Sequence, residues 1–305
     1  MTSLKGKTAF ISGGSRGIGL AIGIALGQHG ANVVIAAKTA STNPKLPGTI
    51  YTAAAAIEEA GGRALAVQMD IRDAQAVEAA INKTVDTFGS LDIVINNASA
   101  ISLTSTLETT PKVFDLVHGV DARGTWLVSK AALPYLIKSA KQGRNPHILT
   151  LSPQLRDNIT KEEFAGRTAY AMAKYGMSLA ALGLSGELEQ YGIASNCLWP
   201  YTSISTEAMR FIAGAKSREI SRTPEIMADA AISMLQKPAE KFTSRFEIDE
   251  VYLRKEHGYT TRDFRKYAQV PDDELILDFF IPQWQHDELA VLRANDTTLA
   301  GQAKL

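Results

Sequence analysis

Short apolar runs alternate with longer amphipathic stretches along most of this chain. The apolar runs, bounded by Gly, Asn or Asp, predict strands at Thr8–Ile11, Val33–Ala37, Ala64–Met69, Ile93–Ile95, Ile148–Leu151, Ile193–Leu198 and Phe246–Ile248. Apolar side chains between them recur at helical spacing and predict helices over residues 16–29, 51–60, 74–88, 111–139 and 168–190. Strands rich in Val, Ile, Leu and Ala that alternate with helices are typical of a parallel sheet covered on both faces. We therefore expect an α/β fold in three layers, with a doubly wound parallel sheet in the middle.

The last part of the chain breaks this pattern. Residues 251–305 are charged and aromatic, and they include the string Asp278-Phe279-Phe280. We expect residues 1–250 to form a single α/β domain. Residues 251–305 are expected to form a C-terminal extension that packs on this domain or on a partner subunit.

Composition and charge exclude several classes of protein. Apolar residues make up 45% of the 305 positions, and the formal net charge is zero. A neutral chain gives no reason to expect nucleic acid or a membrane surface as a partner, and no apolar run is long enough for a transmembrane helix. The first strand begins so close to Met1 that we expect no signal peptide. The lone Cys197, beside Leu198 and Trp199, is typical of a packed thiol in a reducing compartment.

The chain ends on a possible targeting signal. Ala303-Lys304-Leu305 matches the small-basic-Leu pattern of the peroxisomal address. In a eukaryotic source this tripeptide predicts a peroxisomal protein. In a bacterial source it carries no meaning, and we then expect the cytoplasm.

A glycine-rich turn joins the first predicted strand to the first predicted helix. Glycines in such a turn let the backbone approach a dinucleotide pyrophosphate, and the helix N-terminus adds unpaired N–H groups and a positive dipole end. The alternative is a tight turn that binds no ligand. The residues expected to hold the cofactor here are Gly13, Ser15, Arg16, Gly17, Ile18 and Gly19.

The end of the second predicted strand bears on the choice of nucleotide. An acidic residue there would bind the ribose hydroxyls of NAD, whereas this chain reads Ala37-Lys38. Lys38 and Arg16 together offer two cations, which favours the 2′-phosphate of NADP(H). The alternative is that Lys38 is an ordinary solvated lysine. Asp70, at the end of the third strand, is expected to meet the adenine or to cap the next helix.

Small and amide side chains end the fourth predicted strand. Asn96 and Asn97 can join adjacent strand ends through side-chain hydrogen bonds, and the small Ala98 leaves room for a ribose. The plainer interpretation is an asparagine turn.

Tyr170 and Lys174 lie four residues apart on a predicted helix and therefore share one of its faces. A free tyrosine has a pKa of about 10, which makes it a poor acid-base group at neutral pH. A neighbouring ammonium stabilises the phenolate and lowers that pKa toward the working range. Because this helix follows the fifth strand, we expect the pair to lie beside the cofactor.

These motifs and their spacing resemble the short-chain dehydrogenase/reductase family over roughly residues 5–250, with the Rossmann-type sheet of that family. Longer strings, such as Asn96–Leu103 and Ala173–Ser178, are similar to one subgroup that is associated with peroxisomes and also carries a sterol-carrier-type domain. We expect the present chain to be too short for that domain. The resemblance implies that Tyr170 exchanges a proton with the substrate oxygen during hydride transfer at the nicotinamide. It also implies that Lys174 lowers the tyrosine pKa and holds the ribose.

Two departures from the family pattern concern the remaining catalytic positions. The family's asparagine falls on Asp121, whose charge near Lys174 would alter the pKa of Tyr170. The family's serine falls on Pro153, which cannot donate a hydrogen bond, with Ser152 one residue earlier. Either Ser152 substitutes through a local backbone shift, or Tyr170 alone holds the oxyanion.

The loop after the sixth predicted strand resembles the family's nicotinamide-binding loop. Pro200 and Ile204 are its expected cofactor contacts, and residues 203–214 have the spacing of an amphipathic lid over an apolar substrate. The alternative is a helix that simply packs on the domain.

Taken together, these residues predict an NADP(H)-dependent oxidoreductase that acts on a carbonyl or secondary alcohol of an apolar molecule. An enoyl thioester is a second substrate class. A competing hypothesis, raised by Pro153 and Asp121, is a nucleotide-binding protein with altered or lost redox chemistry. The histidines lack metal-ligand spacing, so we expect no metal. The family resemblance also implies a homodimer or homotetramer, formed through the long helices that end near Ser139 and Gln190.

Overall fold

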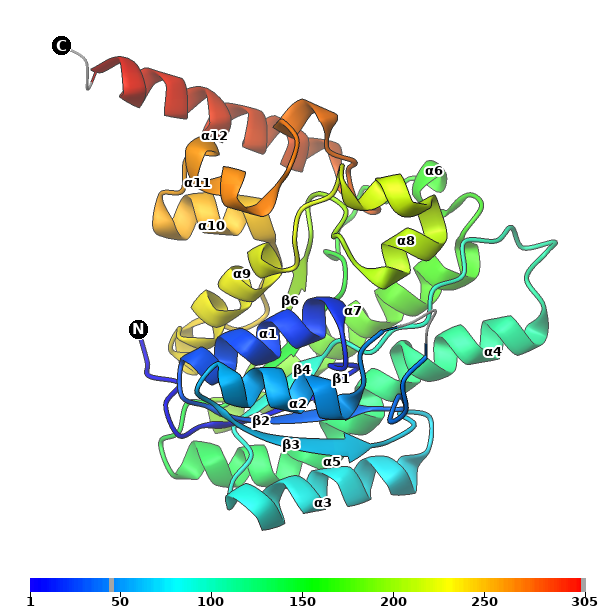
Figure 1. Ribbon diagram of the computed structural model, residues 1–305, viewed down its shortest axis with the longest axis vertical. Coiled ribbons are helices and arrows are strands. Elements are labelled where there is room, and N and C mark those ends of the chain that lie inside the picture. The colour runs from blue at the N-terminus through cyan, green and yellow to red at the C-terminus, as the bar shows by residue number, and fades with distance from the viewer. Residues whose placement is uncertain (44–46, 303–305) are drawn as a thin grey trace.

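A seven-stranded parallel sheet forms the centre of the molecule, in the order β3-β2-β1-β4-β5-β6-β7 (Figure 1). The structure is a computed structural model that describes residues 1–43 and 47–302. Every strand pair is parallel, so the predicted doubly wound α/β fold is confirmed. The strands are β1 (Thr8–Ser12), β2 (Asn32–Ala37), β3 (Arg63–Gln68), β4 (Ile93–Asn96), β5 (His147–Thr150), β6 (Ala194–Trp199) and β7 (Phe246–Ile248).

Side chains on each strand point alternately to the two faces of the sheet, which separates the core into two layers. On one face, Ile11 and Ile35 pack with α1 (Gly17–Gln28), α2 (Ile50–Glu59) and α9 (Glu225–Leu235). On the other face, Phe10 and Val34 pack with α3 (Ala74–Phe88), α5 (Ala122–Lys141) and α7 (Thr168–Leu188). Phe10 is paired in register with Val34, so these two core residues stand side by side. Burial on both faces explains why the strands read as continuous apolar runs.

The predicted helical stretch over residues 111–139 is confirmed, and it consists of two helices that meet at one residue. α4 (Pro111–Val120) and α5 meet at Asp121, whose backbone stays in the right-handed helical region with φ −75° and ψ −74°. The Asp121 carboxylate turns to the loop after β4, where it accepts a hydrogen bond from the backbone N–H of Ala100 at 2.7 Å. The spacing of apolar residues along a helix cannot predict such a hydrogen bond, because its two partners lie far apart in the sequence.

The chain beyond β7 packs on the end of the sheet through α10 (Asp249–His257), α11 (Thr261–Phe264) and α12 (Gln283–Gln302). Figure 1 shows these helices above the sheet, with α12 extending to the C-terminal end. Two short helices, α6 (Lys161–Phe164) and α8 (Glu207–Ala213), lie on the connections that follow β5 and β6. Among the described residues, no helix has the length and apolar character needed to cross a membrane.

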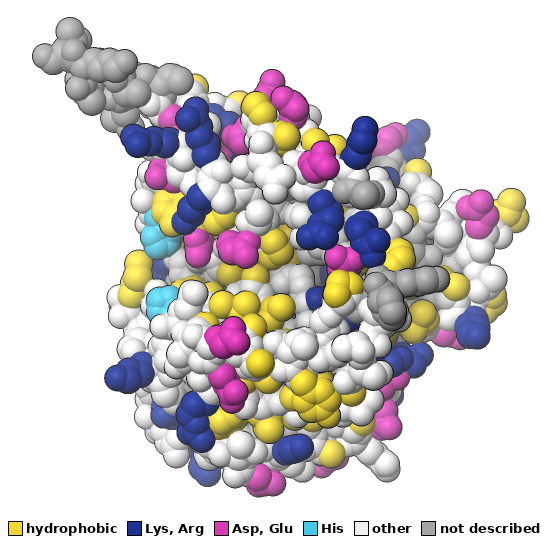
Figure 2. All heavy atoms as spheres, in the orientation of Figure 1, with side chains coloured by type: hydrophobic (Ala, Val, Ile, Leu, Met, Phe, Trp, Pro, Cys, Tyr) yellow, Lys and Arg dark blue, Asp and Glu magenta, His cyan; other side chains and the backbone are white. Residues whose placement is uncertain are grey.

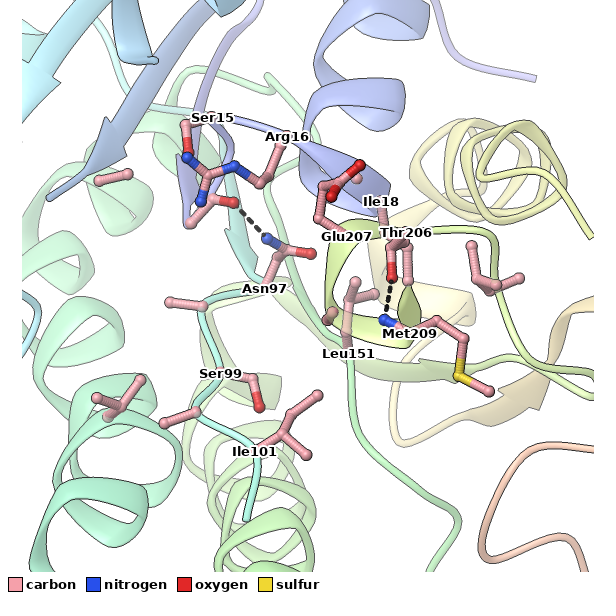
Figure 3. Close-up of a pocket in the computed structure, with 18 of the residues that line it drawn as sticks. Ser15, Arg16, Ile18, Asn97, Ser99, Ile101, Leu151, Thr206, Glu207 and Met209 are labelled. Atoms are coloured by element: carbon pink, nitrogen blue, oxygen red, sulfur yellow. Dashed lines mark hydrogen bonds between the residues drawn. The ribbon is translucent and has the colours of Figure 1, made fainter. Parts of the chain in front are cut away.

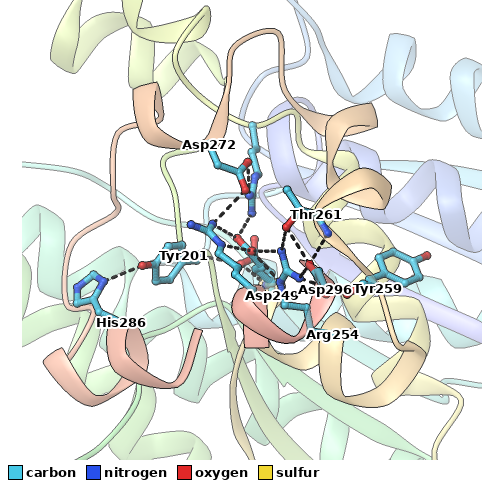
Figure 4. A network of polar contacts seen from close by, with 11 residues as sticks. Tyr201, Asp249, Arg254, Tyr259, Thr261, Asp272, His286 and Asp296 are labelled. Carbon is cyan, nitrogen blue, oxygen red and sulfur yellow. Dashed lines mark hydrogen bonds and ion pairs between the residues drawn. The ribbon is translucent and has the colours of Figure 1, made fainter. Parts of the chain in front are cut away.

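A buried ionic cluster fixes the C-terminal segment to the domain (Figure 4). The carboxylate of Glu250, fully buried at the start of α10, lies against the guanidinium groups of Arg222, Arg254 and Arg293, at 2.5, 2.9 and 2.9 Å. Arg254 also pairs with Asp296 of α12 at 2.7 Å. Because Arg293 and Asp296 belong to α12, the cluster joins three separate stretches of chain.

Candidate active site

A cavity of about 480 Å³ opens at the carboxyl ends of β1, β4, β5 and β6, where a parallel α/β sheet places its ligands (Figure 3). The predicted site residues that line it are Gly13, Ser15, Arg16, Gly17, Ile18, Lys38, Asp70, Asn97, Ala98, Tyr170, Lys174, Pro200 and Ile204. Three predicted residues lie outside its lining: Gly19, Asp121 and Ser152. Basic and acidic side chains are interspersed over the face shown in Figure 2, in keeping with the neutral net charge.

The glycine turn forms a close-fitting cradle at one end of this cavity. A Cβ on Gly13 would lie 2.7 Å from the Cα of Ala98, and a Cβ on Gly19 would lie 2.5 Å from Asn97 Nδ2. Any side chain at either position would therefore push the turn away from β4. α1 begins at Gly17 with no side-chain cap from Arg16 and no acidic residue in its first turn. This arrangement fits a pyrophosphate, because the first N–H groups and the positive helix end face an uncapped position.

Asn97 holds the turn against β4. Its side-chain amide donates to the carbonyl oxygens of Ser12 and Gly13, both at 3.0 Å (Figure 3). Asn96 donates instead to Ser129 of α5, at 3.0 Å. The expected tie between adjacent strand ends is therefore present.

The end of the cavity beside β2 carries the predicted cations. Lys38 Nζ lies 3.4 Å from Asp70, whose carboxylate also pairs with Arg72 at 2.7 Å. The Arg72 hydrogen bond holds the pKa of Asp70 well below its usual range, so this acid is ionised. The Arg16 guanidinium donates to the carbonyl oxygens of Pro47 and Gly48, at 3.1 and 2.8 Å. Asp70 thus acts as an ion-pair partner as well as lining the cavity.

Tyr170 and Lys174 stand together on α7 at the opposite end of the cavity. Their side chains are buried, and Lys174 Nζ donates to the carbonyl oxygen of Leu151 at 2.6 Å. The same ammonium lies 5.0 Å from the centre of the Trp199 ring. Burial lowers the pKa of Lys174, although the carboxylates of Asp121 and Asp278 oppose this change.

The surroundings of Tyr170 act against the low phenol pKa that its spacing from Lys174 suggests. Burial, followed by the negative charges of Asp121 and Asp278, raises the pKa of the Tyr170 phenol well above its ordinary value. Hydrogen bonding with Ser99 lowers that pKa but does not offset the other effects. The phenol is therefore held in its protonated form.

Asp121 lies behind the cavity wall, fully buried, and both of its carboxylate oxygens are hydrogen bonded. Ser99 Oγ donates to Oδ2 and the Ala100 N–H donates to Oδ1, each at 2.7 Å. Burial raises the pKa of Asp121 to about 6, with Lys174 and these hydrogen bonds acting in the opposite direction. The predicted charge near Lys174 is therefore present at neutral pH.

Of the two alternatives for the missing serine, the one that uses Ser152 would need its side chain to turn, because Ser152 lies outside the cavity lining. Ser152 Oγ donates instead to Cys197 Sγ at 3.2 Å, and both residues are buried. The carbonyl of Pro153 accepts from Ser178 Oγ at 2.6 Å, which fixes this turn to α7. The serine that lines the cavity near Tyr170 is Ser99, which the sequence analysis did not single out.

The C-terminal segment supplies another wall that the sequence analysis did not assign. Asp278 and Phe279 line the cavity together with Tyr170 and Lys174. The Asp278 N–H donates to the carbonyl oxygen of Tyr201 at 3.0 Å, and Trp199 Nε1 donates to that of Phe279 at 2.8 Å. Burial raises the pKa of Asp278 to about 7.

The loop after β6 leads into a short helix at the mouth of the cavity. Thr206 caps α8 by accepting from the Met209 N–H at 3.2 Å (Figure 3). Met209 and Ile212 line the cavity, as expected for the apolar face of a lid, while Phe211 is 59% exposed. Within the part of the chain that the structure describes, no cluster of His, Cys, Asp and Glu could hold a metal ion.

Comparisons with known proteins agree with this geometry. The model of the family described as short chain dehydrogenase matches residues 7–215. The chain belongs to the short chain dehydrogenase family. The resemblance in its sequence motifs is thereby confirmed.

Several short chain dehydrogenases match almost the whole chain. Hydroxysteroid dehydrogenase-like protein 2 from Xenopus tropicalis is 49% identical over 300 residues, which is 98% of this chain and 69% of that protein. The human protein of the same name is 49% identical over 281 residues, or 92% of this chain and 65% of that protein. A crystal structure of a short chain dehydrogenase from Mycobacterium thermoresistibile has a TM-score of 0.83 at 49% identity. It covers 92% of this chain and 96% of the other chain.

Family membership sets a coarse expectation for the site. Short chain dehydrogenases bind NAD or NADP, and the cradle at Gly13 and Gly19 has the shape that such a dinucleotide requires. The family model ends at residue 215, so it does not cover Asp278 and Phe279. These two residues line a part of the cavity that the family model does not describe.

Proposed function

We propose that this protein is an NADP(H)-dependent oxidoreductase that transfers a hydride between the nicotinamide and a carbonyl or secondary alcohol of an apolar substrate. The observation that carries the proposal is the position of Tyr170 and Lys174, which line the same cavity as the glycine turn. One end of the cavity thus fits a dinucleotide and the other end offers an acid-base group.

The residues expected to hold the cofactor follow the length of the cavity. The backbone from Gly13 to Ile18 would hold the pyrophosphate at the N-terminus of α1. Lys174, with its ammonium among Leu151, Met177 and Trp199, would hold the nicotinamide ribose, and Pro200 and Ile204 would contact the nicotinamide. The bound nicotinamide supplies or accepts the hydride.

The proposed preference for NADP(H) over NAD(H) rests on the positively charged side chains at the end of β2. β2 ends at Ala37 rather than at an acidic residue, and Lys38 and Arg16 both line the cavity beside it. A 2′-phosphate would gain two cationic partners here, at the expense of the Lys38–Asp70 ion pair and the Arg16 contacts with the 47–48 backbone. Asp70 offsets part of the positive charge, so we expect a preference rather than absolute selectivity.

We assign the transfer of the proton to Tyr170. Its raised pKa keeps the phenol neutral at physiological pH, which is the form that donates a proton to a carbonyl oxygen. The protonated phenol is the form that carbonyl reduction requires of Tyr170. Lys174, held by Leu151, supplies the positive charge that stabilises the phenolate once the proton has left.

The substrate class follows from the cavity walls. Beyond Tyr170 and Ser99, the lining is formed by apolar side chains from several elements: Ala100, Ile101, Trp199, Met209, Ile212, Met227 and Phe279. Such a lining favours an apolar ketone or secondary alcohol. An enoyl thioester remains the second candidate. A protein with altered or lost redox chemistry is the competing hypothesis, since Ser152 is turned toward Cys197 and Pro153 follows it.

A Tyr170→Phe variant tests the proposal. We expect NADPH-dependent reduction of a panel of aromatic and aliphatic ketones by the wild type, and loss of turnover by at least roughly a hundredfold in the variant. Tyr175→Phe is the matched control, because it removes a buried phenol hydroxyl from the same helix outside the cavity lining. NADPH affinity, measured by calorimetry, should be unchanged in both. Equal turnover in wild type and Tyr170→Phe would exclude Tyr170 as the acid-base group.

We further propose that α5 and α7 form an interface between two copies of the chain. These helices pack against each other and leave large apolar side chains exposed, with Trp126 at 49% and Leu179 at 59%. Trp126, Leu133 and Leu184 also line a shallow hollow on this face. Light scattering should give a dimer or tetramer, and Leu179→Glu should shift it toward the monomer.

The peroxisomal prediction rests on Ala303-Lys304-Leu305, which lie outside the described residues. We propose that this tripeptide directs the protein to peroxisomes if its source is eukaryotic. A fluorescent fusion that ends in the native tripeptide should co-localise with a peroxisomal marker, and deletion of Leu305 should disperse it.

A further inference from the structure

A carboxylate from the C-terminal segment lines the cavity without a cationic partner among the described residues. Three acidic side chains of the described part of the chain line this cavity. Asp70 pairs with Arg72 at 2.7 Å, and Glu207 pairs with Arg210 at 2.7 Å. Asp278 is the third, and it is only partly buried. Its charge therefore faces the cavity rather than a neighbouring cation.

Backbone contacts position Asp278 at the cavity wall. Leu277 forms an antiparallel bridge with Thr202 of the loop after β6, and the Asp278 N–H donates to the carbonyl oxygen of Tyr201 at 3.0 Å. Oδ1 of Asp278 accepts from the Phe279 N–H at 2.7 Å. Oδ2 accepts no hydrogen bond from the residues that the structure describes. One carboxylate oxygen is therefore available to a molecule in the cavity.

We propose that Asp278 is a specificity-determining residue, which selects carbonyl substrates that carry a hydroxyl group and rejects those that carry a carboxylate. This inference rests on the proposed function, because it assigns Asp278 to the substrate of Tyr170. Asp278 and Tyr170 line the same cavity, and Phe280, two residues after Asp278, packs 6.2 Å from the Tyr170 ring centre. Asp278 thus lies at the end of the cavity where the proton would be transferred.

The lining around Asp278 decides which hydrogen-bond donor would suit it. Ile101, Trp199 and Phe279 are apolar, so a polar group of the substrate without a partner would be costly there. A hydroxyl group placed against Oδ2 gives both the donor and the carboxylate a partner. The ammonium of Lys174 at the same end disfavours a cationic substrate. The match is therefore a neutral molecule with a hydroxyl group.

Rejection of carboxylates follows from charge. Lys174 alone would attract an anion to this end of the cavity, and Asp278 offsets that attraction. A substrate carboxylate against Asp278 would place two acceptors together with no proton between them. Asp278→Asn removes the negative charge but keeps an oxygen for the Phe279 N–H, so we expect the turn to persist. This variant therefore separates the charge from the fold of the segment.

The experiment measures kcat/KM for NADPH-dependent reduction of a matched set of aryl methyl ketones. They differ in one meta or para substituent, which is hydroxymethyl, ethyl or carboxylate. We expect the wild type to prefer hydroxymethyl over ethyl, and ethyl over carboxylate, each by roughly tenfold. In Asp278→Asn both ratios should fall at least severalfold, mainly through KM. Asp273→Asn, an exposed substitution in the same segment, is the matched control and should keep both ratios.

The wild type also reports on this charge without any substitution. Burial raises the pKa of Asp278 to about 7; Asp249 acts in the same direction, whereas the Phe279 N–H and Lys174 oppose it. The charge of Asp278 therefore grows between about pH 6 and pH 8, while an aryl carboxylate is ionised throughout. The preference for ethyl over carboxylate should rise over this range in the wild type and stay constant in Asp278→Asn. Ionisation of Tyr170 cancels in this ratio, because both ketones use the same phenol.

The outcomes separate this inference from the proposed function. Unchanged ratios in Asp278→Asn, with turnover retained, would overturn the inference alone. Unchanged ratios with weaker NADPH binding by calorimetry would place Asp278 against the nicotinamide and would also overturn it. If the wild type reduces no ketone, or if Tyr170→Phe retains full turnover, the proposed function fails and the inference fails with it.

Discussion

The ring centre of Phe280 lies 6.2 Å from that of Tyr170, so the C-terminal segment packs directly on the tyrosine that we propose as the acid-base group. Phe280 is almost fully buried and also meets Tyr175 at 5.5 Å and Trp199 at 6.0 Å. Its backbone is held in the left-handed region, with φ +64°. A non-glycine residue in that conformation is costly, and here the aromatic cluster offsets the cost.

Phe280 therefore allows packing and backbone strain to be separated. Phe280→Ala should lower the free energy of unfolding by about 3 kcal/mol, because the cluster loses its central ring. Phe280→Gly loses the same ring but also removes the strain at φ +64°, so it should be more stable than Phe280→Ala by about 1 kcal/mol. Urea unfolding of both variants measures this difference. A less stable glycine variant would show that the left-handed backbone carries no strain.

The ionic cluster around Glu250 gives a second test of how the C-terminal segment is held (Figure 4). Glu250→Gln would leave Arg222, Arg254 and Arg293 around a neutral side chain, and we expect a loss of roughly 3 kcal/mol or more in the free energy of unfolding. Glu162→Gln, in an exposed pair with Lys161, is the matched control and should change stability by less than about 1 kcal/mol. Equal effects of the two substitutions in urea unfolding would mean that the buried cluster is not structural.

Asp278 should set the basic limb of the pH–activity profile. Its carboxylate is ionised above its pKa of about 7 and raises the pKa of Tyr170. Removal of the charge in Asp278→Asn should lower the tyrosine pKa, so that the phenol loses its proton and reduction slows at a lower pH. We expect the limb in kcat/KM to move down by roughly one pH unit. Asp273→Asn, an exposed substitution in the same segment, should leave the limb in place, and an upward shift in Asp278→Asn would contradict the account.

Asp249 predicts a pH dependence of stability. Burial raises the pKa of its carboxyl from 3.8 to about 7 in the folded protein, although the N–H groups of Tyr201 and Glu250 donate to it. The folded state therefore prefers the protonated form, so the contribution of Asp249 to stability is full below pH 4 and is lost as the pH rises to 7. Relative to Asp249→Asn, the wild type should lose roughly 3 kcal/mol of unfolding free energy between pH 4 and pH 8. Urea unfolding at several pH values measures this loss, and a difference that is independent of pH would refute the shift.

The sequence predicted the layers of the fold because hydrophobic periodicity is a local signal. It predicted β7 at Phe246–Ile248 with the bounds that the structure has. It did not predict the junction between α4 and α5 at Asp121, whose carboxylate accepts from the Ala100 N–H of a distant loop. Spacing along a helix cannot report a bond to a loop elsewhere in the chain.

The same distinction applies to the site. Tyr170 and Lys174 could be predicted together because they share a helix face. Ser99 and Asp278 could not, because they reach the cavity from a loop and from the C-terminal segment. The pKa of Tyr170 was expected to be low on the strength of Lys174 alone, whereas burial and two carboxylates, which depend on the folded structure, raise it.

Calorimetric titration of the protein with NADPH and then with NADH tests the central claim most directly, with Lys38→Ala and Lys83→Ala measured alongside. Lys83 is exposed on α3, away from the cavity, and serves as the matched control. We expect tighter binding of NADPH than of NADH, with a preference that falls about tenfold in Lys38→Ala and is unchanged in Lys83→Ala. Tighter binding of NADH would contradict the assignment of Lys38 and Arg16 to the 2′-phosphate. Binding of neither nucleotide would contradict the oxidoreductase itself, and the glycine turn would then be only a structural connection.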